Sequence, residues 1–251
     1  MNEGMQCAIE AHGVVCTPWS ELSALRAAPE LAAQAAHLRM SDDQTVLATA
    51  AVLRAIAAAG WQERSFHDWE VIAAPRYLGR SRAALSIARY RKHNIRRHSP
   101  LIIPNQSLHA VAGTLSIALK IHGPNFGMGG GPDHVSESLF TGLGMVRRGR
   151  TSGLWVVVTD FDPEPKLTAN GETDTPTVGR AVALALTPAE ASAGLMLELQ
   201  TQADVNGSAP LRVRELADFL QAGGAGSWCG AIDGVGRLTI RPQSSEARKA
   251  A

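Results

Sequence analysis

The 251-residue sequence has few aromatic residues, few cysteines and almost no net charge. Aromatic residues make up 5% of the chain, and its three cysteines, Cys7, Cys16 and Cys229, form no CxxC pair. This count argues against a disulfide scaffold and a zinc finger. The 24 Lys and Arg residues are balanced by 23 Asp and Glu residues, so the basic excess of a dedicated nucleic-acid-binding protein is missing. The histidines show no HxxxH or HExxH spacing, and we predict neither a metal nor a cofactor.

Signals for membrane insertion and export are also lacking. The first ten residues carry Glu3 and Glu10 and no basic residue, which is unlike a signal peptide. The uncharged run at residues 101–119 contains Pro104, Asn105 and His109, which are too polar for a lipid-facing helix. We therefore predict a cytoplasmic protein with no membrane span.

Strand patterns alternate with long helical patterns along the chain. The helix signal is clearest at residues 41–60, where Ser41 is the predicted N-cap and Gly60 the predicted stop. Strands are predicted at residues 7–18, 69–74, 152–161, 179–187, 194–202 and 228–241, with 179–187 and 194–202 as neighbours. Further helices are predicted at 19–37, 80–97, 106–122, 133–148 and 211–221, and residues 101–104 are expected to be extended.

These patterns predict a three-layer α/β/α fold with a mixed sheet. We expect one domain over residues 1–241, followed by a disordered tail at 242–251. In the helix at 106–122, Leu108, Val111, Leu115 and Leu119 recur at helical spacing and are predicted to face the core.

One stretch resembles a known family. Residues 103–126 read IPNQSLHAVAGTLSIALKIHGPNF, with a Pro-Asn turn, an amphipathic helix and Gly-Pro-Asn-Phe leading into a strand. This stretch resembles the β-ketoacyl synthase family, which has a thiolase-like fold. Similar segments follow the family's order at residues 7–18, 39–60, 152–160 and 179–186. The resemblance covers about residues 7–190 and implies one half of a thiolase-like fold.

The sequence departs from that family at the catalytic position. In the family, a nucleophilic cysteine stands six residues after the Phe, and here Phe126 leads to Pro132. Proline has no nucleophile and no backbone N–H, so the attacking group and one oxyanion donor are missing. The family's catalytic histidines come from a second half, whereas all eight histidines here lie between His12 and His134. We therefore predict no catalytic residue and no condensation by this chain alone.

Half-length homologues without the cysteine resemble the chain-length-factor subunits that pair with an active ketosynthase. The resemblance thus implies a non-catalytic partner subunit in fatty-acid, polyketide or aryl-polyene-type synthesis. The expected partners are an active β-ketoacyl synthase subunit, an acyl carrier protein, or both, in a homodimer or heterodimer.

A second interpretation concerns the residues around the lost nucleophile. Gly129, Gly130 and Gly131, with Asp133 and His134, could form an acyl or oxyanion region at a helix start. A stand-alone acyl-thioester enzyme would use Asp133 and His134 as an acid–base pair. The plainer interpretation is close backbone packing by the glycines, a dipole partner at Asp133 and a capping role for His134.

A third interpretation rests on a basic stretch. Arg89, Arg91, Lys92, Arg96 and Arg97 could form a docking face for an acidic carrier protein or a partner subunit, as in a carrier-binding scaffold. The plainer interpretation is a solvated helix face. Nucleic-acid binding is disfavoured, because Tyr90 is the single aromatic residue in the stretch.

Overall fold

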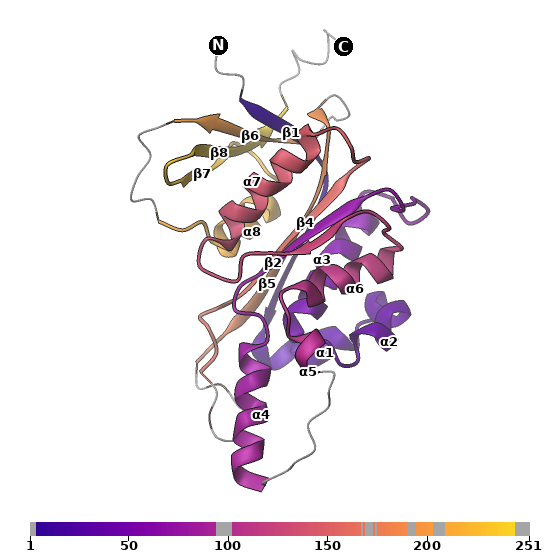
Figure 1. The fold of residues 1–251 in the computed structure, drawn as a ribbon, viewed down its shortest axis with the longest axis vertical. Helices are drawn as coiled ribbons and strands as arrows, with labels where there is room; N and C mark the ends of the chain where they lie inside the picture. The colour runs from indigo at the N-terminus through magenta and orange to yellow at the C-terminus, as the bar shows by residue number, and fades with distance from the viewer. Residues whose placement is uncertain are drawn as a thin grey trace.

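Strands from the whole length of the chain form one mixed sheet with helices on both faces (Figure 1). The computed structural model describes residues 4–93, 102–166, 168, 173, 175–189, 194–202 and 209–243. The strands are β1 (Met5–Pro18), β2 (Glu70–Pro75), β3 (Asn125–Gly127), β4 (Leu154–Asp162), β5 (Val178–Thr187), β6 (Leu195–Thr201), β7 (Trp228–Ile232) and β8 (Gly236–Pro242). Their order in the sheet is β3-β2-β4-β5-β1-β6-β8-β7.

The helices connect these strands and form the two outer layers. The longer ones are α3 (Asp43–Ala58), α4 (Arg80–His93), α6 (His109–Leu119), α7 (His134–Arg147) and α8 (Val213–Gln221). The shorter ones are η1 (Trp19–Glu21), α1 (Leu22–Arg26), η2 (Pro29–Gln34), α2 (Ala35–Leu38) and α5 (Ile102–Asn105). Helices α3 and α6 cover one face of the sheet, and α7 and α8 cover the other, which confirms the predicted three-layer α/β/α architecture.

The sheet is mixed because β2 runs parallel to β3 and β4, while the other described strand pairs are antiparallel. The predicted pairing of residues 179–187 with 194–202 is wrong, because β1 lies between β5 and β6. Residues 8–18 of β1 pair with β5, and residues 5–9 pair with β6. One long N-terminal strand therefore separates two strands that are close in the sequence.

Helix α3 confirms the clearest helix prediction, although its cap is one residue further along. The Asp42 side chain accepts a hydrogen bond from the backbone N–H of Gln44 at 2.9 Å and is the N-cap. The hydroxyl of Ser41, the predicted cap, donates instead to the carbonyl of His37 at 3.0 Å. Gly60 follows the helix with a φ of 70°, the left-handed conformation that favours glycine after a helix end.

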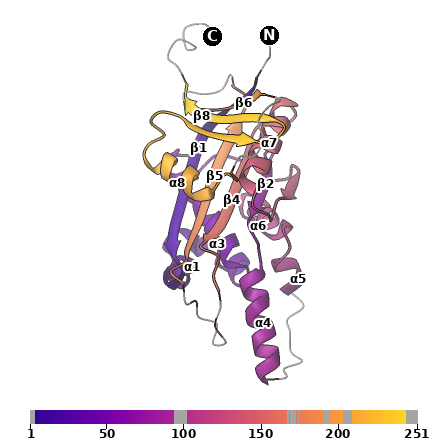
Figure 2. The same cartoon turned by 90° about the vertical axis from the view of Figure 1, so that its left-hand side faces the viewer.

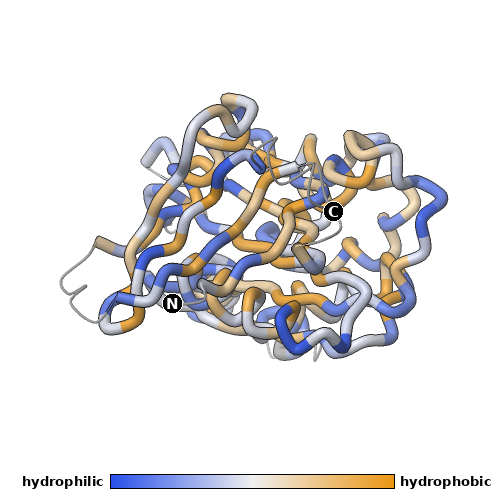
Figure 3. The backbone as a smooth tube through the Cα atoms, turned by 90° about the horizontal axis from the view of Figure 1, so that it is seen from above, coloured by the Kyte–Doolittle hydropathy of each residue, from blue (hydrophilic) through white to orange (hydrophobic). Residues whose placement is uncertain are grey.

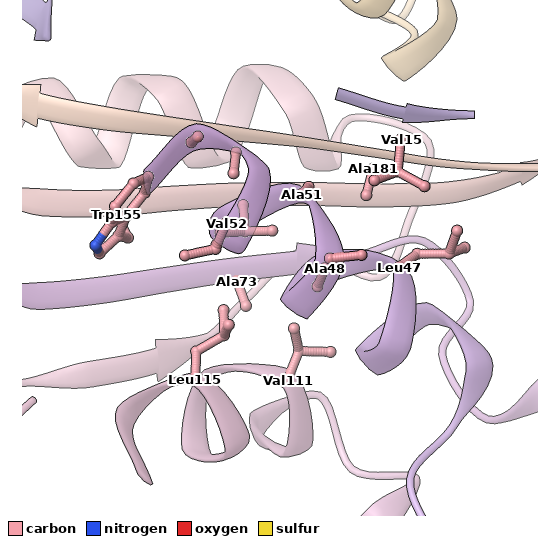
Figure 4. Close-up of a cluster of buried hydrophobic side chains, with 14 of the residues drawn as sticks. Val15, Leu47, Ala48, Ala51, Val52, Ala73, Val111, Leu115, Trp155 and Ala181 are labelled. Carbon is pink, nitrogen blue, oxygen red and sulfur yellow. The ribbon is translucent and has the colours of Figure 1, made fainter. Parts of the chain in front are cut away.

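Small residues let α3 approach the sheet closely (Figure 4). Ala48 and Ala51 of α3 are fully buried beside Val15 of β1 and Ala181 of β5. A side chain at Gly13 of β1 would collide with the backbone of Ala51. The alanine-rich composition of α3 therefore reflects the short distance between helix and sheet.

The central strand β4 is buried on both faces, as its valine-rich sequence predicts. Val157 and Phe161 pack in the core shared with α3, and Val156 and Val158 pack in the core shared with α7. Hydrophobic segments run through the middle of the molecule, and hydrophilic segments are common at its periphery (Figure 3).

Two local predictions are wrong, and a proline is involved in each. Residues 102–105 form the helix α5 and are not extended, since Pro104 falls in a first turn where its missing N–H needs no partner; residue 101 lies outside the described residues. Residues 19–37 form four short helical segments and not one helix. Ala28 is extended at ψ 141°, as expected before a proline, and Pro29 begins η2.

The predicted disordered tail begins too early. Pro242 pairs with Leu195 at the end of β8, and the backbone N–H of Gln243 donates to the carbonyl of Gly194 at 3.1 Å. The remaining tail, residues 244–251, lies outside the described residues. The division into one domain over residues 1–241 stays a prediction.

Helix α4 extends away from the body of the molecule in two perpendicular views (Figures 1 and 2). None of the side chains described on this helix is fully buried. Ion pairs anchor its first turn, from Arg80 to Glu164 at 4.0 Å and from Arg82 to Asp43 at 3.9 Å. Isolated helices of this length are only marginally stable in water.

Candidate functional site

Three parallel strands end at the same edge of the sheet. Strands β2, β3 and β4 end at Pro75, Gly127 and Asp162, and the glycine run at residues 127–131 follows β3. Ligands of open α/β sheets commonly bind outside the carboxyl ends of such strands. The loops after these three strands therefore form the candidate site, and they contain the residues predicted around position 132.

The glycine run packs closely against neighbouring backbone. A side chain at Gly127 would collide with the backbone at the start of α6, and Gly129 and Gly130 have φ values of 76° and 96°. The backbone N–H of Tyr77 donates to the carbonyl of Gly130 at 3.2 Å, which ties the run to the loop after β2. Close packing and positive φ values explain Gly127, Gly129 and Gly130. Packing does not explain Gly131, because a Cβ atom there would meet open space. The oxyanion role of the run stays a prediction.

Pro132 lies in the exposed turn just before α7. The helix begins at His134, one residue later than predicted, and its N-cap residue is Asp133, whose side chain makes no capping hydrogen bond. A proline in this turn can neither attack a thioester nor donate a backbone hydrogen bond to a bound carbonyl oxygen. Pro132 itself therefore supplies neither a nucleophile nor a hydrogen-bond donor at this helix start.

His134 is buried and electrically neutral at pH 7. Its side chain is 1% exposed, and burial lowers its pKa to about 4, with a smaller contribution from Arg76. The nearby backbone of Pro132 and Gly131 partly opposes this shift, but neither ring nitrogen forms a hydrogen bond of normal geometry within the described residues. The predicted capping role is wrong, because Asp133 is the N-cap residue and the ring of His134 is buried.

Asp133 and His134 do not form an acid–base pair in the described structure. Asp133 is exposed, whereas His134 is buried, and no hydrogen bond between their side chains is found among the described residues. A general base must lie within hydrogen-bond reach of the proton that it removes. The two residues are neighbours in sequence, but their side chains lie in different environments.

A hydrogen-bonded group at the same edge was not predicted from the sequence. The Gln44 side chain donates to the carbonyl of Arg76 at 2.8 Å and accepts from the Thr159 hydroxyl at 2.7 Å. These bonds join the N-terminus of α3 to the ends of β2 and β4. Gln44 follows the cap residue Asp42, whose pKa is raised to about 6 by burial. The sequence carried no signal for this group, because Gln44 does not belong to the apolar periodic positions of the predicted helix.

Asp160 on β4 is the second group that the sequence did not single out. It is 2% exposed, and one of its carboxyl oxygens has no hydrogen-bond partner among the described residues. Burial raises its pKa to about 7, an effect that Arg180 and Arg76 oppose and the acids Asp162 and Glu164 reinforce. Asp160 lay inside a predicted valine-rich strand, and the pattern of that strand gives no sign of a charged contact.

The basic stretch is described only in part. Arg91 and Lys92 are exposed on α4, and Arg89 lies on the same helix. Arg96 and Arg97 lie outside the described residues. The docking role of this stretch stays a prediction.

The described residues contain no group of three or more His, Cys, Asp or Glu side chains arranged to hold a metal ion. None of the helices in these ranges is long and apolar enough to cross a membrane.

No protein-family model matches the sequence, and no curated protein matches it. Solved structures do match. A chain of the ketosynthase ApeO in complex with its chain length factor ApeC, from Xenorhabdus doucetiae, aligns with a TM-score of 0.58 and 17% identity. This match covers 94% of the present chain and 99% of that chain, so the two have similar lengths.

Two further matches come from longer chains. A chain of the ishigamide ketosynthase/chain length factor aligns with a TM-score of 0.54 and 16% identity, covering 80% of this chain and 68% of that chain. A chain of AntDE:AntF, a type II PKS acyl-carrier protein in complex with its ketosynthase, aligns with a TM-score of 0.52 and 10% identity. That match covers 74% of this chain and 64% of the other.

These matches define the fold. The chain has the thiolase-like α/β fold of ketosynthases and their chain length factors, as residues 103–126 predicted.

Proposed function

We propose that this protein is a non-catalytic partner subunit of an active ketosynthase, similar to a chain length factor. The observation that carries the proposal is Pro132, which lies just before α7 at the position where the resemblance predicts the nucleophile. The burial of His134 supports it, because the residue is 1% exposed and its ring nitrogens have no hydrogen-bond partner among the described residues. The proposed pathways are fatty-acid, polyketide or aryl-polyene-type synthesis, and the cytoplasmic location stays a prediction.

The sheet edge at β3 is the surface that we assign to the partner. Strand β3 pairs with β2 alone among the described strands, which leaves its outer backbone groups free to bind another strand. Large apolar side chains are exposed on β3 and its flanking helices, at Leu108, Ile117, Phe126 and Phe140. Such a combination of an open edge and apolar neighbours is typical of a protein–protein interface.

Leu108 adds to this assignment by departing from the prediction for α6. Val111 and Leu115 are buried in the core as predicted, and the half-buried Leu119 packs against the core, whereas Leu108 is exposed. One side of α6 therefore packs in the core, while apolar side chains on another side remain available to a partner. We expect the dimer to bury more than about 1,200 Å² in total.

The experiment that tests this proposal co-expresses the chain with the complete ketosynthase encoded nearest its gene. We expect the pair to co-purify. The matched variants Phe126→Asp and Ile87→Asp test whether binding depends on the proposed interface or on exposed apolar side chains in general. Both positions carry exposed apolar side chains, but Phe126 lies on β3 and Ile87 on α4. Phe126→Asp should abolish co-purification, and Ile87→Asp should preserve it.

Size-exclusion chromatography with light scattering measures both outcomes. A monodisperse monomer, alone and mixed with the ketosynthase, would contradict the proposal. Condensation of a malonyl thioester by the purified chain alone would contradict its non-catalytic part and favour the acyl-thioester enzyme instead.

A carrier-binding scaffold is the second candidate, and α4 is the observation that favours it. This helix presents Arg91 and Lys92 to solvent on an element that extends from the body (Figure 2). An acidic carrier protein would be attracted to it through charge complementarity. This role is compatible with a ketosynthase partner bound at β3, since the two surfaces are on different elements.

A further inference from the structure

A cavity of about 640 Å³ lies between the C-terminal ends of α3 and α6 and the loop before β2. It is at the opposite end of β2 from the candidate site. Its apolar lining comes from Leu53, Ile56, Trp61, Phe66 and Leu119. A largely apolar lining with a few polar groups is typical of small-molecule sites, whose volumes run from about 300 to 1,000 Å³.

The acidic side chain that lines this cavity has a basic partner. Glu30 pairs with Arg54 at 2.9 Å, and Asp68, outside the lining, lies 2.7 Å from the ring of His67. Glu10 pairs with Arg64 of the rim at 3.0 Å.

Basic groups remain available at the rim. Lys120 is exposed at the end of α6 and makes no ion pair with any described residue. His122 stacks on His67 with ring centres 4.3 Å apart. The mouth of the cavity therefore carries an unpaired positive charge above an apolar floor, which favours an anionic group over a cationic one.

Lys120 also has an unusual backbone conformation. Its φ is 55°, and the backbone N–H of Ile121 donates to the carbonyl of Ser116 at 2.9 Å, closing α6 in the manner of a Schellman motif. Glycine normally occupies this left-handed position, as Gly60 does at the end of α3. Lys120 is held in this conformation at a cost in stability and lies beside a cavity, which indicates a functional role for its side chain.

We propose that this cavity binds a small amphipathic carboxylate. The apolar part of this ligand packs against Trp61 and Phe66, and the carboxylate group of the ligand lies toward Lys120. Trp61 is half-buried and suited to this contact, with the guanidinium of Arg64 4.0 Å from its ring centre. The site involves neither β3 nor α7, and α6 is the element that it shares with the surface assigned to the ketosynthase partner.

The test measures binding of defined probes to the full-length chain by isothermal titration calorimetry. The probes are octanoate and 3-phenylpropanoate, and the uncharged analogues 1-octanol and 3-phenylpropanol serve as matched ligands. Ala57→Trp blocks the cavity from an exposed position on α3 without a change of charge. Lys120→Gly removes the charge and relieves the left-handed conformation, and Lys92→Ala removes an exposed lysine elsewhere.

We expect at least one carboxylate to bind more tightly than its alcohol by roughly three- to tenfold. Ala57→Trp should abolish this binding, and Lys120→Gly should weaken it by the same factor while raising Tm by roughly 2–4 °C. Lys92→Ala should leave it unchanged. The proposal is overturned if neither carboxylate binds at about 10 mM, if alcohols bind equally well, or if folded Ala57→Trp binds like the wild type.

Discussion

At position 132 the chain carries a proline where its resemblance to ketosynthases predicts a cysteine. The exposed turn accepts this residue without distortion of α7, because the helix begins two residues later. Proline supplies neither a thiol nor a backbone N–H. We therefore predict that the helix start keeps its geometry but has no nucleophile.

Restoring the cysteine tests whether this residue is the only loss. In Pro132→Cys, the new thiol would lie near the positive end of α7, which lowers a thiol pKa, while Asp133 and Glu137 oppose that effect. We expect acylation by a thioester at most, with no condensed product, because His134 is buried and no catalytic histidine is predicted. Stability should change by no more than roughly 1 kcal/mol.

Mass spectrometry of the acylated variant and a condensation assay with a malonyl thioester measure these outcomes. Condensed product from Pro132→Cys alone would refute the prediction and would mean that catalytic groups are supplied from within this chain.

Asp160 makes stability depend on pH in a direction that its raised pKa determines. Its pKa is about 7 in the folded protein and 3.8 ordinarily, so between these values the folded state binds the extra proton. Its contribution to the free energy of unfolding therefore falls as the pH rises from about 4 to 7. The asparagine variant has a similar shape and does not ionise.

We therefore expect Asp160→Asn to be more stable than the wild type by about 1–3 kcal/mol at pH 8, with a smaller difference at pH 5. Urea denaturation at the two pH values measures this difference. Asp218→Asn is the control, because Asp218 is mostly exposed and should change stability little at either pH. A stability difference for Asp160→Asn that grows toward pH 5 would contradict the assignment.

At the scale of elements, the packing of α3 on β1 depends on the absence of a side chain at Gly13. A methyl group there would meet the rigid backbone of Ala51, so helix and strand would have to separate. We expect Gly13→Ala to lower the free energy of unfolding by about 2 kcal/mol or more. Gly131→Ala is the matched control, because its Cβ atom would meet nothing within 4 Å.

Thermal and urea unfolding of the two glycine variants provide the comparison. Equal stabilities for Gly13→Ala and Gly131→Ala would show that α3 does not pack as closely as described. A loss confined to Gly13→Ala would support the close packing of α3.

The elements also differ in how well the sequence predicted them. Periodicity identified α3, β2 and β4 because each buries a regular pattern of apolar residues against the sheet. It failed at α5 and at the segments between residues 19 and 38, where helices are too short for a period to develop. The cap at Asp42 differed from the prediction because Ser41 and Asp42 are both good N-cap residues, and local preference does not choose between them.

At the scale of the whole molecule, α4 extends away from the body (Figures 1 and 2), and the role of its charge is testable. We expect a double variant, Arg91→Glu and Lys92→Glu, to weaken binding of the acyl carrier protein encoded nearest the gene. Binding of the carrier by the wild type should weaken as salt increases, because the charges are exposed. Surface plasmon resonance at two salt concentrations measures both effects.

Arg237 provides a control at a distance from α4. It is exposed on β8, and Arg237→Glu should leave carrier binding unchanged. Equal losses in the α4 variant and the Arg237 variant would indicate a general charge effect and would contradict a docking role for α4.

The sequence by itself determined the layered α/β class, the principal helices and strands, the resemblance carried by residues 103–126 and the presence of a proline at position 132. These features depend on local periodicity and on residue type. The tertiary structure alone decided that β1 separates β5 from β6, that Gln44 joins α3 to the ends of β2 and β4, and that His134 and Asp160 are buried. Strand order and burial arise from contacts between residues far apart in the chain, and local patterns do not encode which distant partner a residue meets.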